Sequence, residues 1–144
     1  MAVVSPDQGG VERAQIFAEN FFHSNKVDIA VIEKRRNLEK IHQSKALNLY
    51  GDVKGKTVII VDDIVTSGRT LINGSEHCLS EGAKEIYIAV VHHELSKETS
   101  DKLNISSVSR FFSTDTIPLD DDVKFPKLEE SSVAEIIAGE IKSL

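Results

Sequence analysis

Short apolar runs alternate with segments of helical periodicity along most of the chain. Runs typical of buried strands occupy residues 2–4, 29–32, 57–61, 86–91 and 108–112. Apolar residues recur at the spacing of one helix face over residues 11–21, 70–80 and, more weakly, 96–102. This alternation predicts an α/β fold with a mostly parallel sheet and helices on both of its faces.

The expected helices differ in how their inward faces are marked. The first is expected to bury Val11, Ala14, Phe17, Ala18 and Phe21. The second, over 70–80, is expected to bury Leu71, Gly74, Ser75 and Cys78, with Gly82 as its C-cap. A last helix, capped by Ser131, is expected to carry Val133, Ile136, Ile137, Ile141 and Leu144 on one side. Residues 33–44 show neither period and are expected to form a loop.

Composition narrows the class of protein. A chain of 144 residues, 40% hydrophobic and 28% charged, is typical of a single soluble domain over 1–144. The net charge of -6 argues against non-specific nucleic-acid binding, and no apolar run approaches the roughly 20 residues of a membrane span. The start of the chain has no basic region followed by an apolar one, and the one cysteine, Cys78, has no partner for an internal disulfide. We therefore expect a cytoplasmic protein.

The segment from Val58 to Thr70 carries the most specific chemistry. An apolar strand leads into two carboxylates, Asp62 and Asp63, and a Thr/Ser/Gly loop then leads into a helix. The carboxylates can accept hydrogen bonds from vicinal sugar hydroxyls or approach Mg²⁺. The loop offers hydroxyls and backbone N–H groups at a helix N-terminus, which is an anion site. Two aspartates and a turn can also simply end a strand, but the whole pattern favours a site for a 5-phosphoribosyl group.

This segment closely resembles the phosphoribosyl pyrophosphate-binding motif of the type I phosphoribosyltransferase fold, which is Rossmann-like. Further segments, in the same order, are similar to those of ribose-phosphate pyrophosphokinases. They are the Ser-Pro-Asp and Gly-Gly turn within 3–13, the strand and loop start at 30–36, the turn at 51–56 and the strand end at 113–118. The resemblance covers nearly the whole chain. It implies an enzyme that transfers pyrophosphate from ATP to ribose 5-phosphate, giving phosphoribosyl pyrophosphate and AMP.

The resemblance also implies roles for individual residues. Asp7 matches an aspartate that helps to hold the Mg²⁺ bound to ATP. Asp62 and Asp63 match the pair on the ribose hydroxyls, through which a second Mg²⁺ can bind. The loop around the 5-phosphate corresponds to Thr66, Ser67, Gly68, Arg69 and Thr70. Lys34 and Arg36 match catalytic loop cations that close over the transferring phosphates.

The chain departs from the family pattern in sequence and in length. Thr66 stands where many members have an aspartate, Arg69 where a smaller residue is common, and Gln8 where the turn has a small residue. Family members are roughly twice as long, so we expect the C-terminal half of a two-domain enzyme whose N-terminal half is absent. The half alone is expected to bind ribose 5-phosphate but to be inactive, and the full enzyme to form dimers or hexamers. Two alternatives remain at this point: a nucleobase phosphoribosyltransferase and a non-catalytic phosphoribosyl-binding partner subunit.

Overall fold

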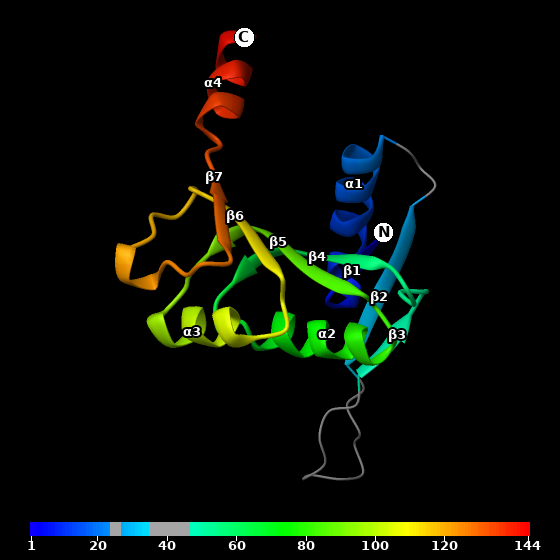
Figure 1. The fold of residues 1–144 in the computed structure, drawn as a ribbon. Helices are drawn as coiled ribbons and strands as arrows, with labels where there is room; N and C mark the ends of the chain where they lie inside the picture. The colour runs from blue at the N-terminus through cyan, green and yellow to red at the C-terminus, as the bar shows by residue number, and fades with distance from the viewer. Residues whose placement is uncertain (24–26, 35–46) are drawn as a thin grey trace.

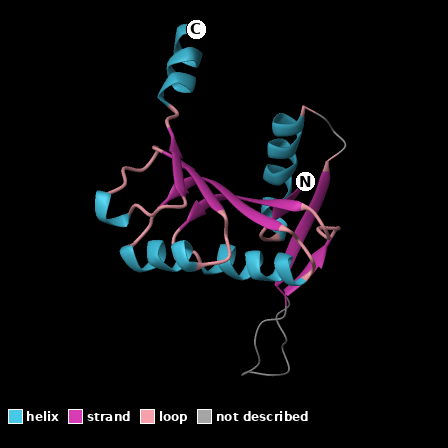
Figure 2. Ribbon diagram, viewed as in Figure 1, coloured by secondary structure: helices cyan, strands magenta, loops and turns pink. Residues whose placement is uncertain are grey.

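The computed structural model describes residues 1–23, 27–34 and 47–144. Within this part of the chain, seven strands form one sheet in the order β3-β2-β1-β4-β5-β6-β7. Every neighbouring pair is parallel except β2 and β3, which are antiparallel. Helix α1 lies on one face of the sheet, and α2 and α3 lie on the other (Figures 1 and 2). The α/β architecture expected from the sequence is confirmed.

The elements follow one another as strand, helix and strand along the chain. The strands are β1 (Ala2–Ser5), β2 (Asp28–Lys34), β3 (Leu47–Tyr50), β4 (Thr57–Val65), β5 (Glu85–His93), β6 (Arg110–Thr114) and β7 (Leu128–Ser131). The helices are α1 (Val11–Phe22), α2 (Arg69–Ser80), α3 (Lys97–Ile105) and α4 (Ala134–Lys142), with 3-10 turns at Gln8–Gly10 and Asp121–Val123.

The central strands are buried on both faces because consecutive side chains point to opposite sides of the sheet. Val3 and Ile59 pack with Ala14 and Ala18 of α1. Their neighbours Val4 and Ile60 pack in the larger core with α2, which buries Leu71, Gly74, Ser75 and Cys78 as expected. The two cores fix β1 and β4 between them, and both strands lead into the residues of the candidate site.

Strand β4 is longer than the sequence predicts. Its pairing with β1 stops at Ile60, but its pairing with β5 continues from Asp62 to Val65. Asp62 and Asp63 therefore lie within the strand and do not follow its end, which corrects the expectation. The physical reason is that a hydrogen-bonded neighbour on one side is enough to keep polar residues extended. On the β1 side, no described strand pairs with β4 after Ile60.

Two edge strands, β3 and β7, were not predicted. β3 has only four residues, and β7 reads Leu-Glu-Glu-Ser, of which three are exposed. β3 reads Leu-Asn-Leu-Tyr over four positions and β7 is mostly polar, so neither has the long apolar run that marks the central strands. The strand expected at 108–112 is shifted by two residues, to Arg110–Thr114.

The expected C-terminal helix is present, but its predicted cap is wrong and its apolar residues are exposed. Ser131 ends β7, and α4 begins at Ala134 without a side-chain cap; Asp115 instead accepts a hydrogen bond from the Val133 amide. Helix α4 buries no residue, and Ile136 is 69% exposed. It extends away from the sheet (Figure 1). A similar correction applies to α1, where Phe22 packs against the core and Phe21 is exposed.

Candidate functional site

The carboxyl ends of β1 and β4 bring together the turn that follows one strand and the acidic pair of the other. After β1, the Ser5 hydroxyl donates to the Asp7 carbonyl oxygen at 2.6 Å, and the Gly10 amide donates to Asp7 Oδ1 at 3.0 Å. These two bonds fold the turn tightly. The side chain of Gln8, which the sequence left without an interpretation, donates to Glu33 of β2 at 2.7 Å and ties the turn to the next strand.

Arg13, in the first turn of α1, binds both carboxylates of the acidic pair. Its Nη1 lies 2.9 Å from Asp62 Oδ1, and its Nη2 lies 2.9 Å from Asp63 Oδ2. The backbone amides add to this frame: that of Asp63 donates to Asp62 Oδ1, and that of Ile64 donates to Asp63 Oδ1. Arg13 was missed at the sequence level. The sequence feature that could have indicated it is its position: Arg13 is a basic residue in the first turn of the helix that packs on β4.

The two aspartates differ in their ionisation. Burial raises the pKa of Asp62 and the side chain of Asp63 adds to the shift, while the hydrogen bond from the Asp63 amide and the charge of Arg13 oppose it. Asp63 is more exposed; burial acts upward on its pKa too, but hydrogen bonds and the charge of Arg13 outweigh it, so this pKa is lowered. The pair titrates as a unit in which Asp62 holds a proton more readily.

A small hollow beside the acidic pair is enclosed by the loop that starts α2. It measures about 70 Å³, and Asp62, Thr66, Ser67, Gly68 and Thr70 are among its lining residues. Gly68 adopts the left-handed conformation, with φ 67°, and its missing Cβ leaves the loop close to Thr99 of α3. The hollow lies at the N-terminus of a twelve-residue helix, where backbone N–H groups and the helix dipole favour an anion.

The structure brings some predicted site residues together and separates others. Asp62 and the loop share the hollow, whereas Arg69 does not line it and instead faces the groove between α2 and α3. Lys34 is the last residue of β2, which runs parallel to β1, so its backbone lies at the same edge of the sheet as the ends of β1 and β4. Arg36 lies outside the described residues.

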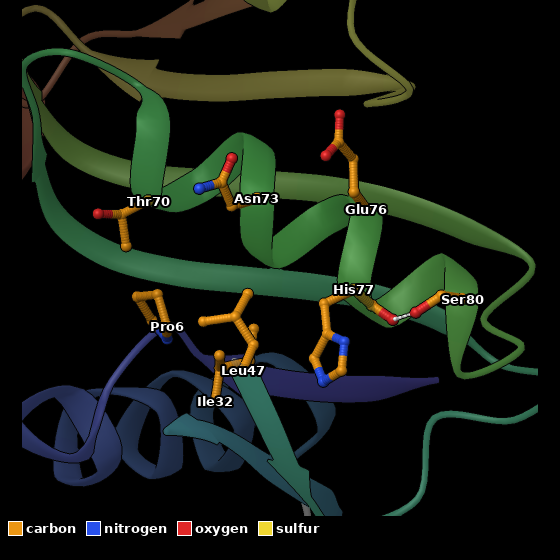
Figure 3. Close-up of a pocket in the computed structure, with 8 residues that line it drawn as sticks. All are labelled: Pro6, Ile32, Leu47, Thr70, Asn73, Glu76, His77 and Ser80. Atoms are coloured by element: carbon orange, nitrogen blue, oxygen red, sulfur yellow. Dashed lines mark hydrogen bonds between the residues drawn. The ribbon is translucent and has the colours of Figure 1, made fainter. Parts of the chain in front are cut away.

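A larger cavity, of about 350 Å³, runs from this edge along α2 toward β3 (Figure 3). Pro6 and Thr70 line one end of it, and His77 lies further along the helix with Ile32 and Leu47 opposite. The Nε2 atom of His77 is buried and has no hydrogen-bond partner among the residues that the structure describes. Pro6 follows β1 directly, so the cavity begins at the edge of the sheet where β1 and β4 end.

Asp7 is suited to a nucleotide-bound Mg²⁺. No group of three or more His, Cys, Asp and Glu side chains in residues 1–23, 27–34 and 47–144 is arranged to hold a metal ion by itself. Mg²⁺ in nucleotide sites needs only one or two carboxylates, with phosphates and waters completing its shell. Asp7 is exposed and uses only Oδ1 in the turn. Its donor set therefore fits a metal that arrives with a phosphate ligand.

A methyl group at Gly10 is expected to disrupt this centre. A Cβ there would lie 2.7 Å from Ser5 Oγ and 3.3 Å from Arg13 Nη1. We expect Gly10→Ala to lower the free energy of unfolding by about 2 kcal/mol, because buried neighbours must shift. Gly9→Ala is the matched control, since its nearest neighbour is Asp7 Oδ1 at an ordinary 3.4 Å. Urea denaturation of both variants checks the difference; equal midpoints would contradict the crowding argument.

Comparison with known proteins gives this arrangement a family. A model of the phosphoribosyl transferase domain matches residues 1–125. The chain belongs to the phosphoribosyl transferase domain family. An orotate phosphoribosyltransferase from Aeropyrum pernix has a TM-score of 0.61 at 16% identity over 99% of this chain and 66% of its own, which is a likeness of fold alone.

Relatives of this phosphoribosyl transferase domain include ribose-phosphate pyrophosphokinases. That of Caldanaerobacter subterraneus subsp. tengcongensis is 40% identical over 98% of this chain and 43% of its own length. That of Gloeobacter violaceus is 37% identical over 98% of this chain and 41% of its own. The phosphoribosylpyrophosphate synthetase structure from Mycobacterium smegmatis has a TM-score of 0.86 at 33% identity, covering 99% of this chain and 44% of that protein. The chain spans less than half the length of these relatives.

No described helix combines the length and apolar character needed to cross a membrane.

Proposed function

We propose that this chain binds ribose 5-phosphate as the C-terminal half of a ribose-phosphate pyrophosphokinase. The observation that carries the proposal is that Asp62 serves two neighbouring features. It belongs to the acidic pair held by Arg13, and it lines the hollow at the start of α2. A ligand with a diol at one end and a phosphate at the other, such as a pentose 5-phosphate, suits this combination. The ribose-phosphate pyrophosphokinases among the relatives support the same substrate.

In this proposal the acidic pair accepts hydrogen bonds from the two ribose hydroxyls, and Thr66, Ser67, Gly68 and Thr70 hold the 5-phosphate. The C1 hydroxyl oxygen then forms a bond to the β-phosphorus of ATP, the bond to the α-phosphate oxygen breaks, AMP leaves, and the hydroxyl proton is released. Lys34 and Arg36 supply positive charge to the transferring phosphates. Such transfers depend on positioning and charge stabilisation more than on covalent catalysis.

Asp7 is the residue that would hold Mg²⁺ together with the phosphates of ATP, where the ion would neutralise the charge that develops on them. Arg69 is proposed to support the 5-phosphate from the rim, since its side chain lines the adjacent groove with Thr66 and Ser67. In this proposal, the N-terminal half of such an enzyme would complete the nucleotide site. We further propose that the full-length protein works in the cytoplasm as a homo-oligomer, a dimer or a hexamer.

The test separates binding from turnover. The 144-residue chain is titrated with ribose 5-phosphate, 2-deoxyribose 5-phosphate and inorganic phosphate, each by calorimetry. We expect ribose 5-phosphate to bind about tenfold more tightly than its 2-deoxy analogue, because a lost hydrogen bond to a charged group costs about 1.5–3 kcal/mol. The chain alone is expected to form no AMP from ATP and ribose 5-phosphate in Mg²⁺.

Each alternative gives a different result. Equal affinity for the deoxy analogue and the parent sugar would remove the role of the acidic pair. Robust AMP formation would show that the chain catalyses the transfer without an N-terminal half. Release of pyrophosphate from phosphoribosyl pyrophosphate in the presence of a nucleobase would indicate a base transferase, and the absence of ribose 5-phosphate binding would overturn the proposal.

A further inference from the structure

The arginine that contacts the acidic pair is the feature of this edge that the proposed function leaves unexplained. Asp62 and Asp63 carry two negative charges side by side, a combination that commonly attracts a divalent cation. Arg13 already spans the pair, with both N–O distances at 2.9 Å. The guanidinium is a planar fork of N–H donors, so one side chain can serve both carboxylates as their cation.

The position of Arg13 is built into the fold. Its side chain is 35% exposed, and that of Asp62 is 18% exposed, so the contact is partly shielded from water. The next residue, Ala14, is fully buried against the sheet and fixes the first turn of α1. Gly10 lets the guanidinium approach the preceding turn, since a Cβ there would lie 3.3 Å from Arg13 Nη1.

Asp7 contrasts with the acidic pair. A Cβ on Gly10 would also lie 3.7 Å from Asp7 Oδ1, so Asp7 and Arg13 flank the same glycine. Among the ion pairs formed by residues 1–23, 27–34 and 47–144, however, none includes Asp7. The acidic pair therefore has a resident cation, whereas Asp7 has no ion-pair partner among the described residues.

We propose that Arg13 is a positioning residue that serves as the fixed counter-cation of Asp62 and Asp63. It donates to one oxygen of each carboxylate. The two carboxylates then bind the sugar directly as hydrogen-bond acceptors, without a divalent cation between them. Mg²⁺ is thereby directed to Asp7. The inference rests on the proposed function for the identity of the sugar, but its charge argument stands on the contacts of Arg13 alone.

The first experiment uses Mn²⁺ alone as the probe, with free Mn²⁺ measured by electron paramagnetic resonance on the 144-residue chain. Arg13→Gln is expected to raise Mn²⁺ affinity about tenfold over the unchanged chain, because it frees two neighbouring carboxylates for the cation. A second substitution, Asp63→Asn, should remove this gain, whereas Asp7→Asn should leave the gain in place. Arg110→Gln is the matched control, since Arg110 pairs with Glu129 at the opposite end of the strands.

The second experiment measures ribose 5-phosphate affinity with EDTA and with Mg²⁺. The unchanged chain should bind equally in both conditions, and Arg13→Gln should bind about tenfold more weakly in EDTA and recover part of the loss in Mg²⁺. Arg13→Lys keeps the charge without the fork, so it should keep low Mn²⁺ affinity but lose sugar affinity. It also serves if Arg13→Gln fails to fold.

Three results would overturn the inference: an unchanged Mn²⁺ affinity in a folded Arg13→Gln variant, a gain that survives Asp63→Asn, or full sugar affinity in Arg13→Lys. If the unchanged chain binds no ribose 5-phosphate, the proposed function fails, yet the Mn²⁺ measurement still decides the role of Arg13.

Discussion

Replacing Gly51 with alanine is expected to destabilise the domain more than any other single methyl group considered above. Gly51 follows β3 with φ 115°, a conformation that residues with a Cβ rarely adopt. The added Cβ would lie 2.6 Å from Ala30 Cβ and 2.7 Å from the Ile29 carbonyl oxygen. The obstacle includes the backbone of β2, which cannot move without breaking its pairing with β1. We expect a loss of about 3–5 kcal/mol in the free energy of unfolding.

Gly55→Ala is the matched control for Gly51→Ala. Gly55 also has a positive φ, 71°, but a Cβ there would meet no atom within 4 Å. The control therefore carries backbone strain without crowding and should cost about 1–2 kcal/mol. Urea denaturation followed by circular dichroism measures both. Similar midpoints for the two variants would show that β3 yields easily, and the crowding argument would be wrong.

The central part of the fold could be predicted because its residues have little choice. The runs at 57–61 and 86–91 are continuous and apolar, and each lies within a strand of the structure. The inward face of α2 was also predicted. Gly82, expected to terminate the helix, adopts φ 92°; its amide donates to the Leu79 carbonyl, and the Ala83 amide donates to that of Cys78. Local chemistry and burial agree in these elements, which is the condition for reading them from sequence.

The edges of the fold follow different rules. β3 and β7 are held by pairing with one neighbour, so their side chains need not be apolar. The last helix has the expected apolar stripe, but periodicity indicates only that a face is suited to burial and not what covers it. Ile136 and Ile141 are accordingly exposed within the described part of the chain.

The residues of the candidate site also differ in whether the sequence could reveal them. Asp62, Thr66, Ser67, Gly68 and Thr70 are contiguous, and the structure gathers them around one hollow as their spacing suggests. Arg13 is 49 residues from Asp62, and no local pattern joins them. Their contact depends on α1 packing beside β4, a tertiary feature that the sequence order implies but does not specify for single side chains.

Asp62→Asn is expected to lose ribose 5-phosphate binding by about 30- to 100-fold while leaving the domain folded. Asparagine keeps an oxygen for Arg13 and the Asp63 amide, both of which contact Asp62 Oδ1. Its NH₂ group replaces the second acceptor oxygen, so a sugar hydroxyl meets a donor where it needs an acceptor. A lost hydrogen bond to a charged group, in the upper part of its range, costs about 2–2.7 kcal/mol, which corresponds to the stated factor.

The stability of this variant separates a binding role from a structural one. Asp62 is partly buried beside Asp63, and its raised pKa indicates that the charged form is disfavoured there. Removing that charge should leave the urea midpoint unchanged or slightly higher.

Asp101→Asn is the control, because Asp101 forms an exposed ion pair with Lys97 on α3. Calorimetric titration with ribose 5-phosphate measures the binding. Unchanged affinity in Asp62→Asn would remove the acidic pair from the site, and a parallel loss of binding and stability would assign Asp62 to the structure alone. The expected combination, a stable domain that no longer binds the sugar, follows only if the carboxylate is kept in this costly position for its ligand.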